Sequence, residues 1–108
     1  MMLLFEIDGI KFYKEDFQDD FSEYVDIIPI IQEFQEALSI EKISCTSDND
    51  CCYGTKENYF AEIQGVINSE DEFLLLEEVD SPGENLDLFV IRIYMCTNCG
   101  KWIIDILE

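Results

Sequence analysis

The architecture of this chain follows from residues 86–107, LDLFVIRIYMCTNCGKWIIDIL. Two runs rich in β-branched and aromatic residues, 86–96 and 101–107, flank a short polar connection at 97–100. Such runs on either side of a turn predict two adjacent strands. We therefore expect an antiparallel strand pair at the end of the chain.

Two more hairpins are predicted upstream of this pair. Residues 58–68 and 72–79 lie on either side of a polar turn and predict a second strand pair. Near the N-terminus, residues 3–7 and 10–13 flank an Asp-Gly dipeptide. Asp-Gly between apolar runs favours the positive φ angles of a two-residue hairpin turn. The chain is therefore expected to open with a β-hairpin.

Helical spacing of apolar residues appears between residues 16 and 39, where Phe17, Phe21 and Tyr24 share one face. Pro29 disfavours helical geometry in the residue before it and suits the first turn of a new helix. We expect two helices, or one kinked helix, and then a short strand at 40–46. The element order predicts one α+β domain over residues 1–108: a mostly antiparallel sheet, built from the N-terminal hairpin and C-terminal strands, with one or two helices packed on one face.

The balance of charge limits the possible partners. The 108 residues include 25 acidic and 6 basic side chains and no histidine, which gives a net charge of −19. Six cations cannot offset this negative field at a phosphate backbone, so direct binding to nucleic acid is excluded. The lack of histidine also excludes histidine-based acid–base catalysis and histidine metal ligands.

Neither a targeting segment nor a membrane span is recognisable in the sequence. The N-terminal run MMLLFEIDGI lacks a basic region, and no apolar run reaches the ~18 residues that a membrane span needs. We expect a cytoplasmic protein with no membrane partner.

The chain has no phosphate-binding loop, dinucleotide fingerprint or nucleophile elbow, and a cysteine nucleophile would lack its usual histidine base. We therefore predict that it is not an enzyme.

The most specific motif is CTNCGK at residues 96–101. Two thiolates at this spacing can bind one tetrahedral metal ion, and the glycine permits the positive φ that turns the chain back. The motif resembles the zinc knuckle of zinc-ribbon and rubredoxin-like sites, which implies a structural zinc ion with four protein ligands. Two alternatives remain open: buried thiols without metal, and a redox-active thiol pair. The candidate zinc ligands are Cys45, Cys51, Cys52, Cys96 and Cys99.

Carboxylates recur at intervals of three and four residues along the first expected helix, and a second acidic cluster lies within residues 70–87. On a helix, a four-residue step places them ~6 Å apart, close to the spacing of phosphates along a nucleic-acid strand. Such a face would attract a basic protein and speed its association; the alternative is a surface that only aids solubility. The predicted partner-binding residues are Glu15, Asp16, Asp19, Asp20, Glu23, Asp26, Glu77, Glu78 and Asp80.

A small, acidic, lysine-poor chain has the character of toxin-immunity proteins and of phage anti-restriction or anti-CRISPR inhibitors, some of which mimic DNA. The resulting hypothesis is an inhibitor that binds and blocks a basic, nucleic-acid-acting protein such as a toxin nuclease or a phage-defence effector. The alternative is a zinc-stabilised protein-interaction or adaptor module whose acidity is only solubilising. An exposed edge strand could also support a homodimer.

Overall fold

A computed structural model describes residues 2–46, 53–67, 73–75 and 87–107 of the chain. Its largest element is a five-stranded antiparallel sheet with the order β3-β4-β6-β7, in which β5 also pairs with β4. The long central strands β4 and β6 pair without a shift in register from Asn58↔Cys96 to Ile67↔Asp87. The strands are β3 (Glu41–Ser44), β4 (Glu57–Ile67), β5 (Phe73–Leu75), β6 (Asp87–Cys96) and β7 (Trp102–Leu107).

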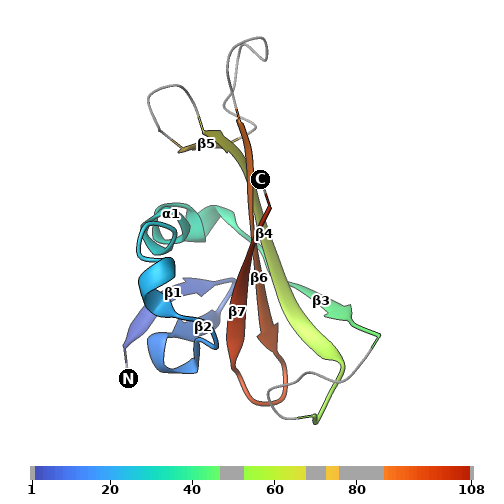
Figure 1. Cartoon of the computed structure of the whole chain (residues 1–108). Coiled ribbons are helices and arrows are strands. Elements are labelled where there is room, and N and C mark those ends of the chain that lie inside the picture. The colour runs from blue at the N-terminus through green and yellow to red at the C-terminus, as the bar shows by residue number, and fades with distance from the viewer. Residues whose placement is uncertain (1, 47–52, 68–72, 76–86, 108) are drawn as a thin grey trace.

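The N-terminal hairpin forms a separate two-stranded sheet of β1 (Leu3–Ile7) and β2 (Ile10–Tyr13). Its turn has φ 53° at Asp8 and φ 85° at Gly9, which confirms the positive-φ turn predicted from Asp-Gly. The hairpin and the helical segment that follows it lie together on one face of the large sheet (Figure 1). The predicted α+β fold, mostly antiparallel, is therefore confirmed.

Trp102 joins the hairpin to the sheet. Its side chain is 1% exposed, and its ring lies 5.3 Å from Phe5, 5.4 Å from Phe12 and 4.5 Å from Phe17, measured between ring centroids. The indole Nε1 donates a hydrogen bond of 2.8 Å to the carbonyl of Tyr13. One residue of β7 thus contacts both strands of the hairpin and the segment after it, and this contact closes the core.

The helical segment is less regular than the sequence predicts. It contains the short 3₁₀ turns η1 (Lys14–Asp16) and η2 (Phe21–Glu23), the helix α1 (Ile28–Phe34) and the final turn η3 (Gln35–Ala37). The expectation of a helix beginning near residue 16 is wrong. Phe17 forms a parallel bridge with Trp102, and the Gln18 N–H donates to the Trp102 carbonyl at 3.0 Å. This pairing with the edge of β7 holds the backbone extended where a helix would need to propagate.

The predicted helix with Pro29 in its first turn is confirmed, but α1 already includes Ile28, where Pro29 was expected to disfavour helical geometry. Two glutamines attach this helix to the hairpin. The Gln32 side chain donates to the Leu4 carbonyl at 2.8 Å, and the Gln35 side chain accepts from the Glu6 N–H at 2.9 Å. These bonds satisfy polar groups on β1 that no strand of the described chain pairs with.

Gly65, near the C-terminal end of β4, pairs closely with Leu75 of the neighbouring strand β5. A Cβ atom added there would overlap the Phe73 ring and lie 2.7 Å from the Leu74 carbonyl oxygen. We expect Gly65→Ala to lower the free energy of unfolding by about 1–3 kcal/mol, because backbone and ring must move apart. Urea unfolding measures this loss of stability. Val66→Ala is the comparison, because it removes buried volume at the next residue instead of adding an overlapping atom. An unfolding midpoint for Gly65→Ala equal to that of the wild type would contradict the close packing.

Candidate functional site

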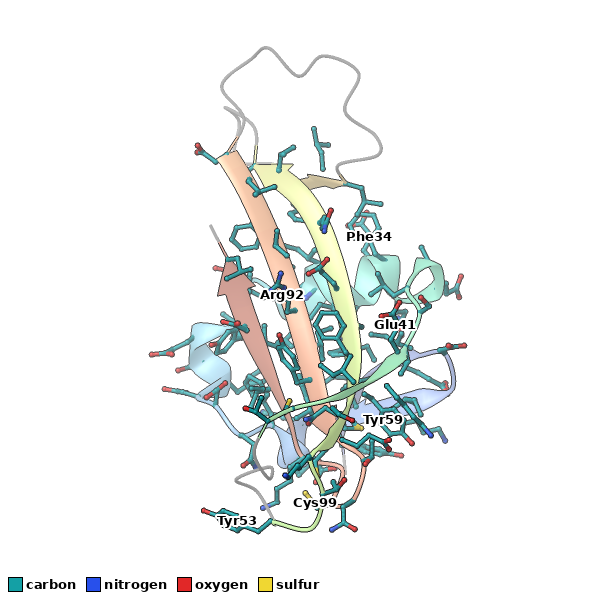
Figure 2. All side chains as sticks on the ribbon, turned by 90° about the vertical axis from the view of Figure 1, so that its right-hand side faces the viewer. Phe34, Glu41, Tyr53, Tyr59, Arg92 and Cys99 are labelled. Atoms are coloured by element: carbon teal, nitrogen blue, oxygen red, sulfur yellow. The ribbon has the colours of Figure 1, made fainter. Side chains whose placement is uncertain are left out.

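The acidic segment, residues 14–27, runs along the edge of β7 and presents its carboxylates to solvent (Figure 2). Five of its six acidic side chains are exposed, whereas Phe17, Phe21 and Tyr24 pack against the core. The one lysine of the segment, Lys14, places its Nζ 4.7 Å from the centroid of the Phe21 ring. The predicted partner-binding residues within this segment are Glu15, Asp16, Asp19, Asp20, Glu23 and Asp26.

These carboxylates do not form the regular helical row expected from their spacing, because the segment consists of turns and extended residues. Two of them have structural partners. Asp20 Oδ1 accepts from the N–H and the hydroxyl of Ser22, and these bonds lower the pKa of Asp20. Glu15 accepts from the main-chain nitrogen of Met2. The regular helical row is therefore not formed, but the charge of the segment remains.

The electrostatic environment of Tyr24 includes three carboxylates. Burial, followed by the negative charges of Asp19, Glu23 and Asp105, raises the pKa of the Tyr24 phenol. Asp105 comes from β7, far along the chain, and was not among the predicted site residues. The sequence could have indicated that Asp105 is exposed, because side chains alternate between the two faces of a strand. In β7, the exposed residues Ile103, Asp105 and Leu107 alternate with more buried ones.

The second predicted acidic cluster is described only at its end. Asp87, the first residue of β6, is exposed. The predicted partner-binding residues Glu77, Glu78 and Asp80 lie outside the described residues.

The cysteines that the structure describes gather at one end of the sheet. Asn58, 8% exposed, is paired in register with Ile43 and with Cys96, and its side-chain amide donates to the Cys45 sulfur at 3.4 Å. Cys96 is buried and Cys99 is half-buried. Gly100 has φ 81°, and its N–H donates to the Cys96 carbonyl at 3.0 Å, which confirms the turn that the motif predicts.

Within residues 2–46, 53–67, 73–75 and 87–107, no group of three Cys, His, Asp or Glu side chains is placed to hold a metal ion. Asn58 is the residue that Cys45 and Cys96 have in common, because its side chain donates to Cys45 and its backbone position pairs in register with Cys96. Cys51 and Cys52 lie outside the described residues. The zinc prediction is therefore neither confirmed nor overturned.

The open face of the sheet, which is the face turned away from the hairpin, carries mixed aromatic and charged residues. The rings of Phe60 and Tyr94 lie 5.1 Å apart between centroids at an interplanar angle of 49°, and Arg92 Nε donates to Glu62 Oε2 at 2.7 Å. Figure 2 looks onto this face, with Arg92 near its centre and Glu41 toward the edge formed by β3. A pocket of about 510 Å³ opens between that edge and the residues around η3.

Glu62→Gln is expected to lower stability slightly at neutral pH. The hydrogen bond from Arg92 lowers the pKa of Glu62 below its ordinary 4.5, against an opposing effect of burial. A depressed folded-state pKa contributes stability that is present above the unfolded-state pKa and is lost as the pH falls through the folded value. Urea unfolding should show a gap between variant and wild type at pH 7 that closes on acidification. A gap unchanged at about pH 3 would contradict the ionic origin.

Comparisons with known proteins assign no family to this chain. No family model, no curated protein and no solved structure matches it. In the part of the chain that the structure describes, no helix is long and apolar enough to cross a membrane.

Proposed function

We propose that this chain is a small acidic inhibitor of the immunity-protein type, which binds a basic protein and blocks it. The observation that carries the proposal is the acidic segment, which has six carboxylates and one lysine on a backbone held by half-buried aromatic side chains that pack against the core. The target class is a nucleic-acid-acting enzyme, such as a toxin nuclease or a phage-defence effector, because such enzymes expose a basic groove for phosphates. Occupying that groove would exclude the substrate.

Two physical features support binding through this segment. The Phe17 ring lies 5.3 Å from Tyr24 and 4.5 Å from Trp102, so the carboxylates project from a backbone that is already ordered. A pre-ordered surface loses less conformational entropy when it binds. The net charge of −19 adds long-range attraction, which raises the rate of encounter with a cationic partner.

The proposed binding relies on charge complementarity and not on a copy of the DNA backbone. The helical row of carboxylates that suggested mimicry is not formed, because the acidic segment contains 3₁₀ turns and extended residues, so mimicry is not part of the proposal. A cytoplasmic location belongs to the same proposal, because the intended targets act on nucleic acid there. No catalytic step is proposed for this chain.

Affinity capture tests the proposed function. The immobilised full chain is exposed to host lysate at about 0.1 M and about 0.5 M salt, and the retained proteins are identified by mass spectrometry. One basic nucleic-acid-acting protein, retained best at low salt and inhibited by the purified chain, is the expected result. A partner retained equally at both salt concentrations, or no retained partner, would contradict the proposal.

A zinc-stabilised interaction module is the second candidate, favoured by the gathering of Cys45, Cys96 and Cys99 at one end of the sheet. Zinc would tie the turn at residues 97–100 to the connection before β4. Metal binding would then be coupled to folding, so a chelator should lower the unfolding midpoint. Elemental analysis that finds no zinc, together with a midpoint unaffected by chelator, would exclude this candidate.

A further inference from the structure

The outward side of β7 carries three exposed residues in alternating positions. Ile103, Asp105 and Leu107 alternate with residues that pack into the core or against it, so all three lie on the open face of the sheet. Ile103 and Leu107 are each 38% exposed, and Asp105 between them is exposed as well. These three residues form the β7 strip.

On the side toward β6, the β7 strip continues into apolar and aromatic side chains. The register of the two strands places the half-buried Tyr94 opposite Ile103. The same register places the buried Val90 opposite Leu107. Both neighbours lie on the open face, because directly paired residues of adjacent strands point to the same side of a sheet. This flank of the strip is therefore mainly apolar.

On its other side, the β7 strip adjoins the acidic segment. The Gln18 N–H donates to the carbonyl of Trp102, the residue directly before the strip, and Figure 2 shows the acidic segment alongside β7. The charge of Asp105 acts on Tyr24 of that segment, whose pKa is raised first by burial and then by the carboxylates around it. The strip thus has one apolar flank and one strongly negative flank.

The spacing of the β7 strip matches that of residues along one side of a helix. Successive outward residues of a strand lie about 6.6 Å apart, since each residue advances the strand by about 3.3 Å. A four-residue step along an α-helix covers about 6 Å. A helix lying along β7 therefore brings its residues i, i+4 and i+8 opposite Ile103, Asp105 and Leu107. A single strand on this face would leave its main-chain groups without partners, whereas a helix satisfies them internally.

We propose that the β7 strip binds an amphipathic basic helix of the partner protein. Apolar residues at positions i and i+8 of that helix contact Ile103 and Leu107, and a lysine or arginine at i+4 pairs with Asp105. The basic flank of the helix faces the acidic segment, and its apolar flank faces Tyr94. This inference rests on the proposed function, since it specifies which element of the basic partner is held.

Charge complementarity selects a basic helix and not a second copy of this chain. Each copy carries a net charge of −19, so two copies repel each other. A helix without cations would gain only the burial of aliphatic surface on Ile103 and Leu107. A basic helix gains the same burial and also the attraction of Asp105 and the acidic segment, as in other helix recognition by an apolar face with charged flanks.

The test uses the full chain and a labelled, alanine-rich peptide of about 15 residues, which is long enough to form a helix. The peptide has leucine at i and i+8 and lysine at i+4 and along one flank. A control peptide of the same composition carries its two leucines on the opposite face. Fluorescence anisotropy should show the first peptide binding about tenfold or more tightly than the control. Equal binding of the two peptides would overturn the inference, because charge alone would then explain it.

Variants of the protein locate the bound peptide. The double variant Ile103→Ser, Leu107→Ser should weaken binding about tenfold, whereas Leu3→Ser, at an apolar position of β1 that is 47% exposed, should not. Amide NMR of the wild-type chain should show the peptide perturbing residues 103–107. Perturbation confined to residues outside β7 would overturn the inference, and this measurement does not depend on the folding of any variant.

The pairing with the cation at i+4 is tested separately. Asp105→Asn should weaken the peptide about twofold to fivefold, the range expected for an exposed ion pair, whereas the control Glu33→Gln on α1 should not. Equal binding by these two variants would contradict the assigned pairing.

The captured partner distinguishes this inference from the proposed function. If the Ile103→Ser, Leu107→Ser variant retains a basic partner as well as the wild type does, the inference is overturned and the proposed function stands. If the peptides differ as expected but no basic partner is captured, the helix-binding strip is supported and the proposed function fails.

Discussion

Replacing Trp102 with alanine is expected to lower the free energy of unfolding by about 3–5 kcal/mol, more than Gly65→Ala or Glu62→Gln. The indole is 1% exposed and contacts the rings of Phe5, Phe12 and Phe17. Its removal leaves a cavity between the hairpin and the sheet and also strips the Tyr13 carbonyl of its donor. Because small domains are stable by only about 5–15 kcal/mol, the variant should lie close to the unfolding threshold.

Two control substitutions separate the contributions to this loss. Trp102→Phe keeps a ring in the core but lacks the indole donor, so its effect should be intermediate. Ile103→Ala removes an exposed neighbour on the same strand, where the side chain is 38% exposed, and should cost much less. Urea unfolding followed by circular dichroism measures all three variants. If Trp102→Ala unfolded at the same midpoint as Ile103→Ala, Trp102 would not join the two sheets as described.

Neutralising three carboxylates of the acidic segment is expected to slow association with the basic partner by about tenfold or more. The triple variant Asp19→Asn, Glu23→Gln, Asp26→Asn keeps the size of each side chain and removes three negative charges. It spares Asp20 and Glu15, which accept hydrogen bonds within the fold. Since steering acts before contact, the association rate constant should change more than the dissociation rate constant.

A matched triple variant controls for net charge alone. Glu33→Gln, Glu36→Gln and Glu41→Gln remove the same number of charges from exposed positions on α1, η3 and β3. Stopped-flow or biosensor kinetics with the captured partner compares the two triples. Equal slowing by both would mean that only total charge matters, and the acidic segment would lose its assigned role.

Most of the sheet could be predicted from sequence because its signals are local. Alternating apolar runs and a turn dipeptide identified the hairpin at residues 3–13 and the pairing of β6 with β7. The path of residues 16–28 could not be predicted correctly, because the interaction that competes with a helix is remote. Phe17 has the spacing of a helical face, but its backbone pairs with Trp102, far along the chain.

In the candidate site, too, local properties could be predicted from the sequence and features that depend on remote contacts could not. The sequence identified which residues of the acidic segment would be exposed acids, because charge is a property of each residue. Their arrangement depended on the backbone path and was predicted wrongly. The charge of Asp105 acts on Tyr24 only because this segment packs along β7.

The most direct test of the central claim is the association rate constant of the wild-type chain with its captured partner, measured as salt is raised. The Debye length falls from about 10 Å at 0.1 M to about 3 Å at 1 M, so steering by exposed carboxylates should fade over this range. We predict a steep fall in the rate constant as salt increases. A rate constant that stays unchanged from low to high salt would contradict an electrostatic inhibitor.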